Sequence, residues 1–350
     1  MSPRVQSALT SAWVERGLLS HTLLPVAWLY GALTALHRAT YRLGLAKSHS
    51  VAVPVIVVGN VIAGGAGKTP TVLGIVEHLR AQGARPGIVS RGFGGQHVAP
   101  VEVTPASEAR VVGDEPLLLQ RASGVPVVVG RDRVAACHGL LERHPELTHI
   151  VCDDGMQHYR LHRDVEVCVF DSRGLGNQRL LPAGMLRQHW PVADVAAAGQ
   201  SARQRLVLRT GPCDLPGFSA TRTLAPHAVN GHGEMQPLSA LAHSGRPLLA
   251  LAGIAQPENF FAMLRAAGVP LERTLALPDH YDFDSYSRTE HERYTLICTG
   301  KDATKLWRVE PEAWCAPLIQ TLPPDFLSAL DAALHRASPP LSSPHGHTTH

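Results

Sequence analysis

The stretch VVGNVIAGGAGKTP, Val57 to Pro70, decides the fold of this 350-residue chain. An apolar strand runs into a glycine-rich turn, after which Gly67-Lys68-Thr69 opens a helix. The glycines free backbone N–H groups to wrap phosphate oxygens, and a helix N-terminus adds a favourable field. The match to G-x-x-x-x-G-K-[ST] is complete except at the first glycine position, where Ile62 stands. The stretch predicts a P-loop for a nucleoside triphosphate, with these residues around the phosphates and Mg²⁺: Gly64, Gly65, Ala66, Gly67, Lys68 and Thr69.

Short β-branched runs alternate with helical stretches on both sides of this motif. This alternation favours a parallel sheet covered by helices on both faces. We therefore expect an α/β fold: a P-loop NTPase-like parallel sheet flanked by helices, an N-terminal membrane-associated helix and a smaller C-terminal α/β lobe. The predicted strands lie at 54–58, 87–90, 125–129, 149–152, 165–170, 205–208, 247–253, 273–277 and 294–299, and predicted helices at 133–143, 257–268 and 325–336.

Changes in composition divide the chain into four predicted parts. They are an N-terminal membrane-associated helical region (1–47), a P-loop core (48–210), a second lobe that completes the core and the active-site cleft (211–337) and a disordered tail (338–350).

Charge and cysteine usage exclude several classes of protein. A net charge of +3, without a Lys/Arg-dense block, argues against a nucleic-acid binder. The six cysteines have no C-x-x-C spacing, so we expect buried, reduced thiols, a reducing cytoplasm and no cysteine-bound metal.

The N-terminal region carries an apolar run of fourteen residues, LLPVAWLYGALTAL, from Leu23 to Leu36. As a helix it would reach about 21 Å, short of the roughly 30 Å hydrocarbon core of a bilayer. Trp28 and Tyr30, with Arg38 and Arg42 one turn apart, suit a helix embedded in the cytoplasmic leaflet. A helix buried in the protein core is one alternative, and a tilted helix that spans the bilayer is another.

Acidic side chains and one histidine lie where they could take part in catalysis, either at the end of a predicted strand or at the start of a helix. In HIVCDDG (149–155), Asp153 and Asp154 end a buried strand, where Walker-B acids hold the metal's water shell. GDEP (113–116) places Asp114 before a helix, which is equally consistent with a helix cap and a catalytic role. LPDHYDF (277–283) places His280 just past a strand, where functional loops of open α/β sheets gather.

Two arginines lie on loops that could bind phosphate. SRGFGG (90–95) offers Arg91 as a phosphate clamp, and LLPAGMLRQ (180–188) offers Arg187 in the same capacity.

The ordered set GNVIAGGAGKTP, SRGFGG, GDEP, DDGMQH, DSRGLGNQRLLPAGMLR, PDHY and KDATK resembles the tetraacyldisaccharide 4′-kinases of lipid A biosynthesis. The resemblance runs from the N-terminal helix to about Lys305. It implies transfer of the ATP γ-phosphate to the 4′-hydroxyl of a membrane-embedded tetraacyldisaccharide 1-phosphate. The protein would then act at the cytoplasmic face of the bacterial inner membrane, held peripherally or by its N-terminal helix.

The resemblance also implies roles for residues at matching motif positions. Lys68 would act on the phosphates and Thr69 on Mg²⁺, with Asp153 and Asp154 in the Walker-B role. Asp114 would take the hydroxyl proton with His280 as its partner, and Arg187 would neutralise phosphate charge. The substrate residues would be Arg91, Gln157 and Asn177. Three positions depart from the family pattern, namely Gln188 in place of an acid, His189 in place of proline and Met156 in place of an aromatic.

Three other functions fit the sequence less well. A switch ATPase of the partitioning kind usually has lysine before the paired glycines, where this chain has Ala63. A GTPase requires [NT]-K-x-D, whereas Thr299 to Asp302 reads TGKD. A lipid-binding scaffold does not need the intact Lys68 and Thr69. The oligomeric state is left open by the sequence.

Overall fold

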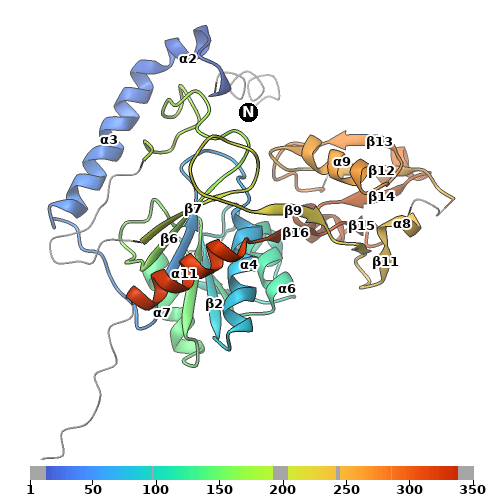
Figure 1. Cartoon of the computed structure of the whole chain (residues 1–350). Helices are drawn as coiled ribbons and strands as arrows, with labels where there is room; N and C mark the ends of the chain where they lie inside the picture. Colours follow the sequence, from blue (N-terminus) through green and yellow to red (C-terminus); the bar gives the residue numbers. More distant parts are fainter. Residues whose placement is uncertain (1–12, 97, 192–203, 242–244, 285, 338–350) are drawn as a thin grey trace, which may run out of the picture.

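The computed structural model describes residues 13–96, 98–191, 204–241, 245–284 and 286–337. They form two lobes, each built on a sheet, which a two-stranded ribbon joins (Figure 1). The predicted tail, 338–350, lies outside the described residues.

An eight-stranded sheet forms the first lobe, in the order β3-β4-β2-β5-β1-β6-β7-β8. All its strand pairs are parallel except β3 with β4. The strands are β1 (Val55–Gly59), β2 (Pro86–Ser90), β3 (Val101–Val103), β4 (Val127–Val129), β5 (His149–Asp153), β6 (Val165–Phe170), β7 (Gln204–Arg209) and β8 (Phe218–Ser219).

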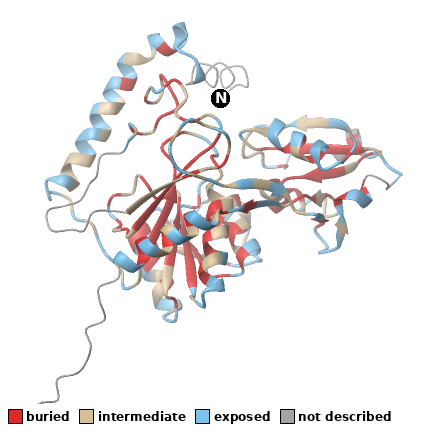
Figure 2. Cartoon of the chain, viewed as in Figure 1, coloured by how far each residue is buried: buried red, intermediate tan, exposed pale blue. Residues whose placement is uncertain are grey.

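Helices cover both faces of this sheet because its central strands are apolar on both sides. On β1, Val55 and Val57 face one core, whereas Ile56 and Val58 face the other. The helices of this lobe are α4 (Lys68–Ala81), α5 (Ala109–Val112), α6 (Asp114–Ser123), α7 (Arg133–Arg143) and α11 (Pro324–Ala337). Figure 2 shows the central strands as the most deeply buried part of the lobe.

A six-stranded mixed sheet, β11-β10-β15-β14-β12-β13, forms the second lobe. Its strands are β10 (His227–Val229), β11 (Met235–Pro237), β12 (Leu248–Ala252), β13 (Leu271–Ala276), β14 (Thr295–Cys298) and β15 (Trp314–Cys315). Its helical elements are α8 (Leu238–Leu241), α9 (Pro257–Ala266), η1 (Arg288–His291) and α10 (Gly300–Leu306). The prediction of an α/β fold with a main parallel sheet is confirmed, and the second sheet is mixed.

The antiparallel ribbon of β9 (Thr221–Leu224) and β16 (Leu318–Thr321) carries the chain out to the second lobe and back. After the ribbon, α11 returns to the first lobe, where Phe326 and Leu330 are fully buried in the same core as Ile56. The predicted limits of the four parts of the chain stay a prediction.

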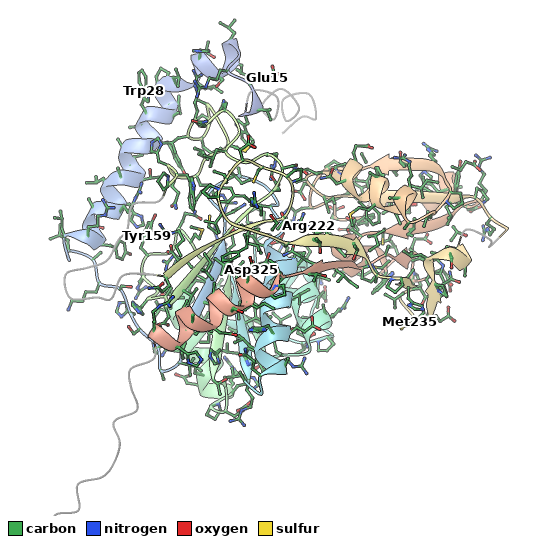
Figure 3. All side chains as sticks on the ribbon, in the orientation of Figure 1. Glu15, Trp28, Tyr159, Arg222, Met235 and Asp325 are labelled. Carbon is green, nitrogen blue, oxygen red and sulfur yellow. The ribbon has the colours of Figure 1, made fainter. Side chains whose placement is uncertain are left out.

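The N-terminal region consists of α2 (Leu18–Thr22) and α3 (Leu24–Arg42), which lie along the outside of the first lobe (Figure 1). Ala27 is the buried residue of α3, whereas Trp28 is 69% exposed and points away from the protein (Figure 3). The alternative of a buried core helix is therefore wrong. Among the described residues, no helix is both long enough and apolar enough to cross a bilayer.

Candidate functional site

The glycine loop, residues 60–67, connects β1 to α4. Gly64 and Gly67 adopt left-handed φ angles of 87° and 86°, which L side chains rarely adopt. Gly67 is the N-cap of α4, so Lys68 and Thr69 open the helix as predicted. The loop thus presents the start of a helix to a ligand, as anion-binding loops do.

Two arginine side chains donate hydrogen bonds to the carbonyl groups of this loop. Arg173, paired with Asp171 at 2.6 Å, donates to the carbonyl oxygens of Ala63 at 3.2 Å and Gly65 at 3.0 Å. Arg222, on β9, donates to the carbonyl of Ala66 at 3.2 Å. These contacts anchor the loop through three of its carbonyl groups.

Sequence reasoning missed both arginines. The DSRG motif after β6 was a local signal for Arg173, because acidic and basic residues follow a buried strand there. No local signal marks Arg222, which reaches the loop through the ribbon at the junction of the lobes (Figure 3).

The segment that carries Arg187 pairs with the glycine loop. Ala63 donates its N–H to the carbonyl of Met185 at 2.8 Å, and Arg187 donates its own to the carbonyl of Val61 at 2.7 Å. This pairing brings the Arg187 side chain to Asp154, with Nη1 at 3.1 Å and 3.3 Å from the two carboxylate oxygens.

Asp154 lies between Arg187 and Lys68, whose Nζ is 3.6 Å from its Oδ1. Burial alone would raise the pKa of this carboxyl, but the two cations outweigh it and lower the pKa. Asp154 has a φ of 50°, a strained conformation that non-glycine residues keep mostly at functional sites. The structure therefore joins Lys68, Asp154 and Arg187 in one ionised cluster.

Asp153 differs from its neighbour. It ends β5 with 1% of its surface exposed, and its Oδ1 has no hydrogen-bond partner. The hydroxyl of Ser90 donates weakly to Oδ2, at 3.4 Å. Burial and the negative charge of Glu115 raise the pKa of Asp153 to about 7. A buried carboxylate oxygen without a partner fits a site that a cation would complete.

These carboxylates do not form a self-sufficient metal site. Within the described ranges, no three His, Cys, Asp or Glu side chains are grouped to hold a metal ion. Mg²⁺ nevertheless needs only one or two carboxylates when substrate phosphates and water supply its other ligands. Thr69, Asp153 and Asp154 are suitable for that kind of site.

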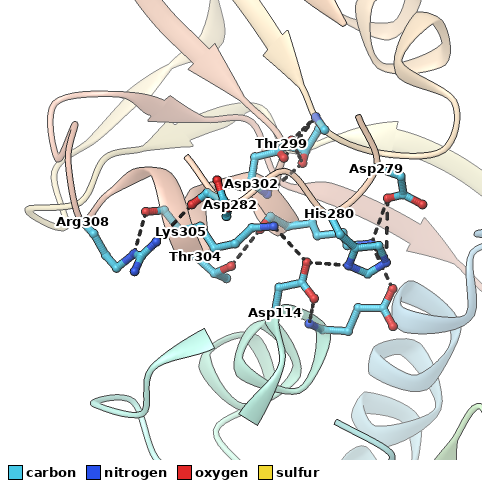
Figure 4. Close-up of polar contacts among 12 residues, drawn as sticks. Asp114, Asp279, His280, Asp282, Thr299, Asp302, Thr304, Lys305 and Arg308 are labelled. Carbon is cyan, nitrogen blue, oxygen red and sulfur yellow. Dashed lines mark hydrogen bonds and ion pairs between the residues drawn. The ribbon is translucent and has the colours of Figure 1, made fainter. Parts of the chain in front are cut away.

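A second cluster forms where the two lobes meet (Figure 4). Asp114, the first residue of α6, is 5% exposed, and His280 follows β13 with a φ of 63°. His280 Nδ1 lies 3.1 Å from Asp114 Oδ2, and Lys305 Nζ lies 3.2 Å from the same oxygen. The structure thus pairs two predicted catalytic residues that are 166 positions apart.

The charge states within this cluster are interdependent. Burial would raise the pKa of Asp114, but the hydrogen bond from His280 and the charges of Lys301 and Lys305 hold it well below its usual range. The hydrogen bond with Asp114 raises the pKa of His280, against burial and the charge of Lys301. Asp114 is therefore an anion at neutral pH.

The three predicted substrate residues lie in different surroundings. Arg91 is exposed and has no polar partner in the described part of the chain. Gln157 is half-buried and donates to the carbonyl of Asn60 at 3.1 Å. Asn177 is 4% exposed, with its amide donating to Ser20 Oγ and to the carbonyl of Ala183, both at 2.9 Å. Roles in substrate binding stay predictions, and the Asn177 contacts link its loop to α2.

Of the departures from the family pattern, Met156 is accommodated by packing, whereas the buried Nε2 of Gln188 has no hydrogen-bond partner among the described residues. Met156 is buried against Gly59, and its side chain occupies the space that a Cβ on Gly59 would need. Gln188 is buried and accepts a hydrogen bond from the Tyr159 hydroxyl at 3.0 Å.

Comparisons with known proteins agree on one family. A family model described as tetraacyldisaccharide-1-P 4′-kinase (LpxK) matches residues 19–335. The tetraacyldisaccharide 4′-kinase of Acidovorax ebreus is 53% identical over 329 residues, which cover 93% of this chain and 94% of that protein. That of Polaromonas naphthalenivorans is 47% identical over 352 residues, covering 99% and 100%. A crystal structure of "apo" form LpxK from Aquifex aeolicus in complex with ATP is similar with a TM-score of 0.75 and 26% identity, covering 91% of this chain and 99% of the other.

Proposed function

The chain belongs to the tetraacyldisaccharide-1-P 4′-kinase family, and we propose that it transfers the γ-phosphate of ATP to the 4′-hydroxyl of a tetraacyldisaccharide 1-phosphate. The observation that carries this proposal is that the same molecule contains two clusters of ionisable side chains. Lys68, Asp154 and Arg187 lie beside the glycine loop, and Asp114 lies with His280 at the junction of the lobes.

The glycine loop would hold the phosphates of ATP as a P-loop. Lys68 would contact the β- and γ-phosphates, and its contact with Asp154 shows that the side chain reaches the acidic end of β5. Arg187 is close enough to the same carboxylate to share the task of neutralising phosphate charge. ATP is the nucleotide in the similar Aquifex structure.

A cavity of about 810 Å³, lined by residues that follow β6 and β7, is the site that we propose for the nucleoside of ATP. It lies at the carboxyl ends of β6 and β7, where ligands of open parallel sheets bind. Its lining includes Arg173, which contacts the loop, and Arg209 and Asp214, which could bind a base or ribose.

Mg²⁺ would be held by Thr69, Asp153 and Asp154 together with the phosphates, and when bound it would neutralise the charge that develops on the transferred group. The orphaned Oδ1 of Asp153 and its raised pKa support this assignment, because a cation would stabilise the ionised carboxylate.

Asp114 would accept the proton of the sugar hydroxyl while the new O–P bond forms and the bond from the γ-phosphorus to the leaving ADP oxygen breaks. An aspartate is a weak base for an alcohol, but in a loose transition state the proton leaves late and positioning supplies most of the rate. His280 orients the carboxylate through its hydrogen bond to Oδ2.

The apolar surface of α3 would rest in the cytoplasmic leaflet of the bacterial inner membrane, where an acylated acceptor resides. Its exposed large apolar residues are Val26, Trp28, Leu29, Leu33 and Leu36, each more than half exposed. On the opposite side, the Tyr30 hydroxyl donates to the carbonyl of Arg187 at 2.8 Å. This contact ties the proposed membrane-facing helix directly to the phosphate site.

Incubation with γ-labelled ATP and a tetraacyldisaccharide 1-phosphate in detergent micelles tests the proposal. Wild type should produce a labelled lipid bisphosphate, and Lys68→Ala should not. Hydrolysis of ATP without labelled lipid would instead favour a switch ATPase.

A further inference from the structure

Lysine is rare in this chain, which makes its placement informative. Only four of the 32 lysine and arginine residues are lysines, and three of these four are Lys68, Lys301 and Lys305. Lys68 follows the glycine loop at the start of α4, and the other two belong to the KDATK motif on α10, which has no role in the function described so far. A compact ammonium suits a site that needs a point charge, whereas the planar guanidinium of arginine suits forked pairing.

Helix α10 turns both of its lysines toward the first lobe. Lys301 and Lys305 are four residues apart and therefore lie on the same face of the helix. The intervening Asp302 faces the second sheet, where both of its carboxylate oxygens accept from the N–H of Gly253 at 3.1 Å. The Thr299 hydroxyl caps the helix by accepting from the N–H of Asp302 at 3.2 Å. The second sheet thus fixes the direction of both lysines.

Both lysines contact the Asp114 cluster (Figure 4 shows Lys305). Lys305 is 9% exposed, and its Nζ lies 3.2 Å from Asp114 Oδ2. Lys301 Nζ lies 3.1 Å from His280 Nε2 and 3.3 Å from one oxygen each of Glu115 and Asp279. An ammonium has no lone pair, so Nε2 must accept, and the imidazole proton is then on Nδ1, facing Asp114.

We propose that Lys305 is a positioning residue for phosphoryl transfer: together with His280 it occupies Oδ2 of Asp114 and leaves Oδ1 to take the hydroxyl proton. In this arrangement Lys301 fixes the tautomer of His280, and so directs its Nδ1–H to the same oxygen. The remaining contact of Oδ1 is the N–H of Glu115 at 3.2 Å. This inference rests on the proposed role of Asp114 as the proton acceptor.

The groups around Asp114 make a clear prediction about pH. Glu115 on α6, His280 on the loop after β13, and Lys301 and Lys305 on α10 are the titratable groups that face it. A carboxylate next to a cation has a pKa lowered by about 1–3 units, so loss of one ammonium should raise it. Because Asp114 acts as the anion, activity would then be lost at a higher pH on the acidic side.

The test is the pH profile of kcat/KM for the lipid acceptor in wild type, Lys305→Met and the control Arg265→Met. Arg265 is an exposed cation at the end of α9, on the same lobe. We expect Lys305→Met to lower kcat at least tenfold, to move the acidic limb upward by about 1–3 pH units and to leave the KM for ATP unchanged. Arg265→Met should match wild type. A lower rate at every pH with an unmoved acidic limb would overturn the inference, as would an unchanged profile.

Two further variants separate the possible failures. If Lys305→Met does not fold, Lys305→Gln keeps an N–H donor near Oδ2 without the charge, and the same shift of the acidic limb is expected. If Asp114→Asn retains the wild-type rate, the proposed proton acceptor is wrong and the inference fails with it. If Asp114→Asn loses the rate while both Lys305 variants keep the wild-type acidic limb, only the role of Lys305 is wrong.

Discussion

Neighbouring charges give two adjacent aspartates opposite character. Asp154 contacts Lys68 and Arg187, which lower its pKa, whereas burial, reinforced by the charge of Glu115, raises the pKa of Asp153 to about 7. The same residue type therefore serves as an ionised partner of the phosphate-binding cations and as a carboxyl group that awaits a cation. Sequence position alone did not distinguish these two states, because they depend on contacts from other elements.

Gly67 is expected to tolerate no side chain. Its φ of 86° costs an L residue roughly 1–2 kcal/mol, and a Cβ there would lie 1.4 Å from the Arg222 guanidinium. Gly67→Ala should weaken ATP binding at least tenfold, which titration calorimetry would measure. Gly83, just past the other end of α4, has a φ of 80° with open space around it. The control variant Gly83→Ala therefore introduces the same backbone strain without a steric clash. Equal ATP affinity in the two variants would contradict the contact with Arg222.

His280 should respond to the loss of Lys301. The ammonium lowers the pKa of His280, so its removal in Lys301→Met should raise that pKa. NMR titration of ¹³C-labelled histidine would measure the change, with His280→Gln used to assign the signal. An unchanged or lower pKa would show that Lys301 does not face the ring in solution.

At the scale of elements, local sequence patterns predicted β1 and α4, the strand and the helix on either side of the P-loop. The apolar run of β1, the glycines and the start of α4 lie where the sequence indicated, since each depends on nearby residues. Helix α7 also spans the predicted residues 133–143. The second sheet was harder to predict from the sequence because β10, β11 and β15 are two or three residues long and leave no periodic signal.

The site itself was predictable only where motifs are local or where family resemblance supplied the partner. Lys68, Asp153 and Asp154 follow from strand ends that a parallel sheet brings to one edge. The contact of Asp114 with His280 joins residues of different lobes, which no spacing indicates. Arg222 was missed for the same reason, because it contacts the loop by way of the ribbon.

The apolar face of α3 should control access to lipid. Full burial of a leucine side chain is worth roughly 1.5–3 kcal/mol, so Leu29→Ser with Leu33→Ser should raise the KM for the lipid acceptor by about tenfold or more. The KM for ATP should not change. Ala32→Ser with Ala35→Ser, exposed on the same helix, removes much less apolar area and serves as the control. Kinetics in vesicles of anionic lipid would measure both, and an unchanged lipid KM in the leucine variant would refute contact with the membrane.

At the scale of the whole molecule, the proposed reaction needs both lobes. The first lobe supplies the glycine loop and Asp114, and the second supplies His280 and the lysines of α10. The ribbon that joins them contacts the loop through Arg222, and it contacts α4 through Gln320, whose amide donates to the Thr71 hydroxyl at 2.6 Å. The position of the second lobe is thereby connected to the nucleotide site as well as to the proton acceptor.

The most direct test measures ATP binding and phosphate transfer in Asp114→Asn and compares both with wild type prepared in the same way. Asparagine keeps the shape of the side chain and an oxygen for His280 and Lys305, but it cannot accept the proton as a carboxylate does. We predict near-normal ATP affinity and a kcat lowered by about 10²–10⁴. Loss of ATP binding would show that Asp114 serves only to start α6, and an unchanged kcat would contradict its role as proton acceptor.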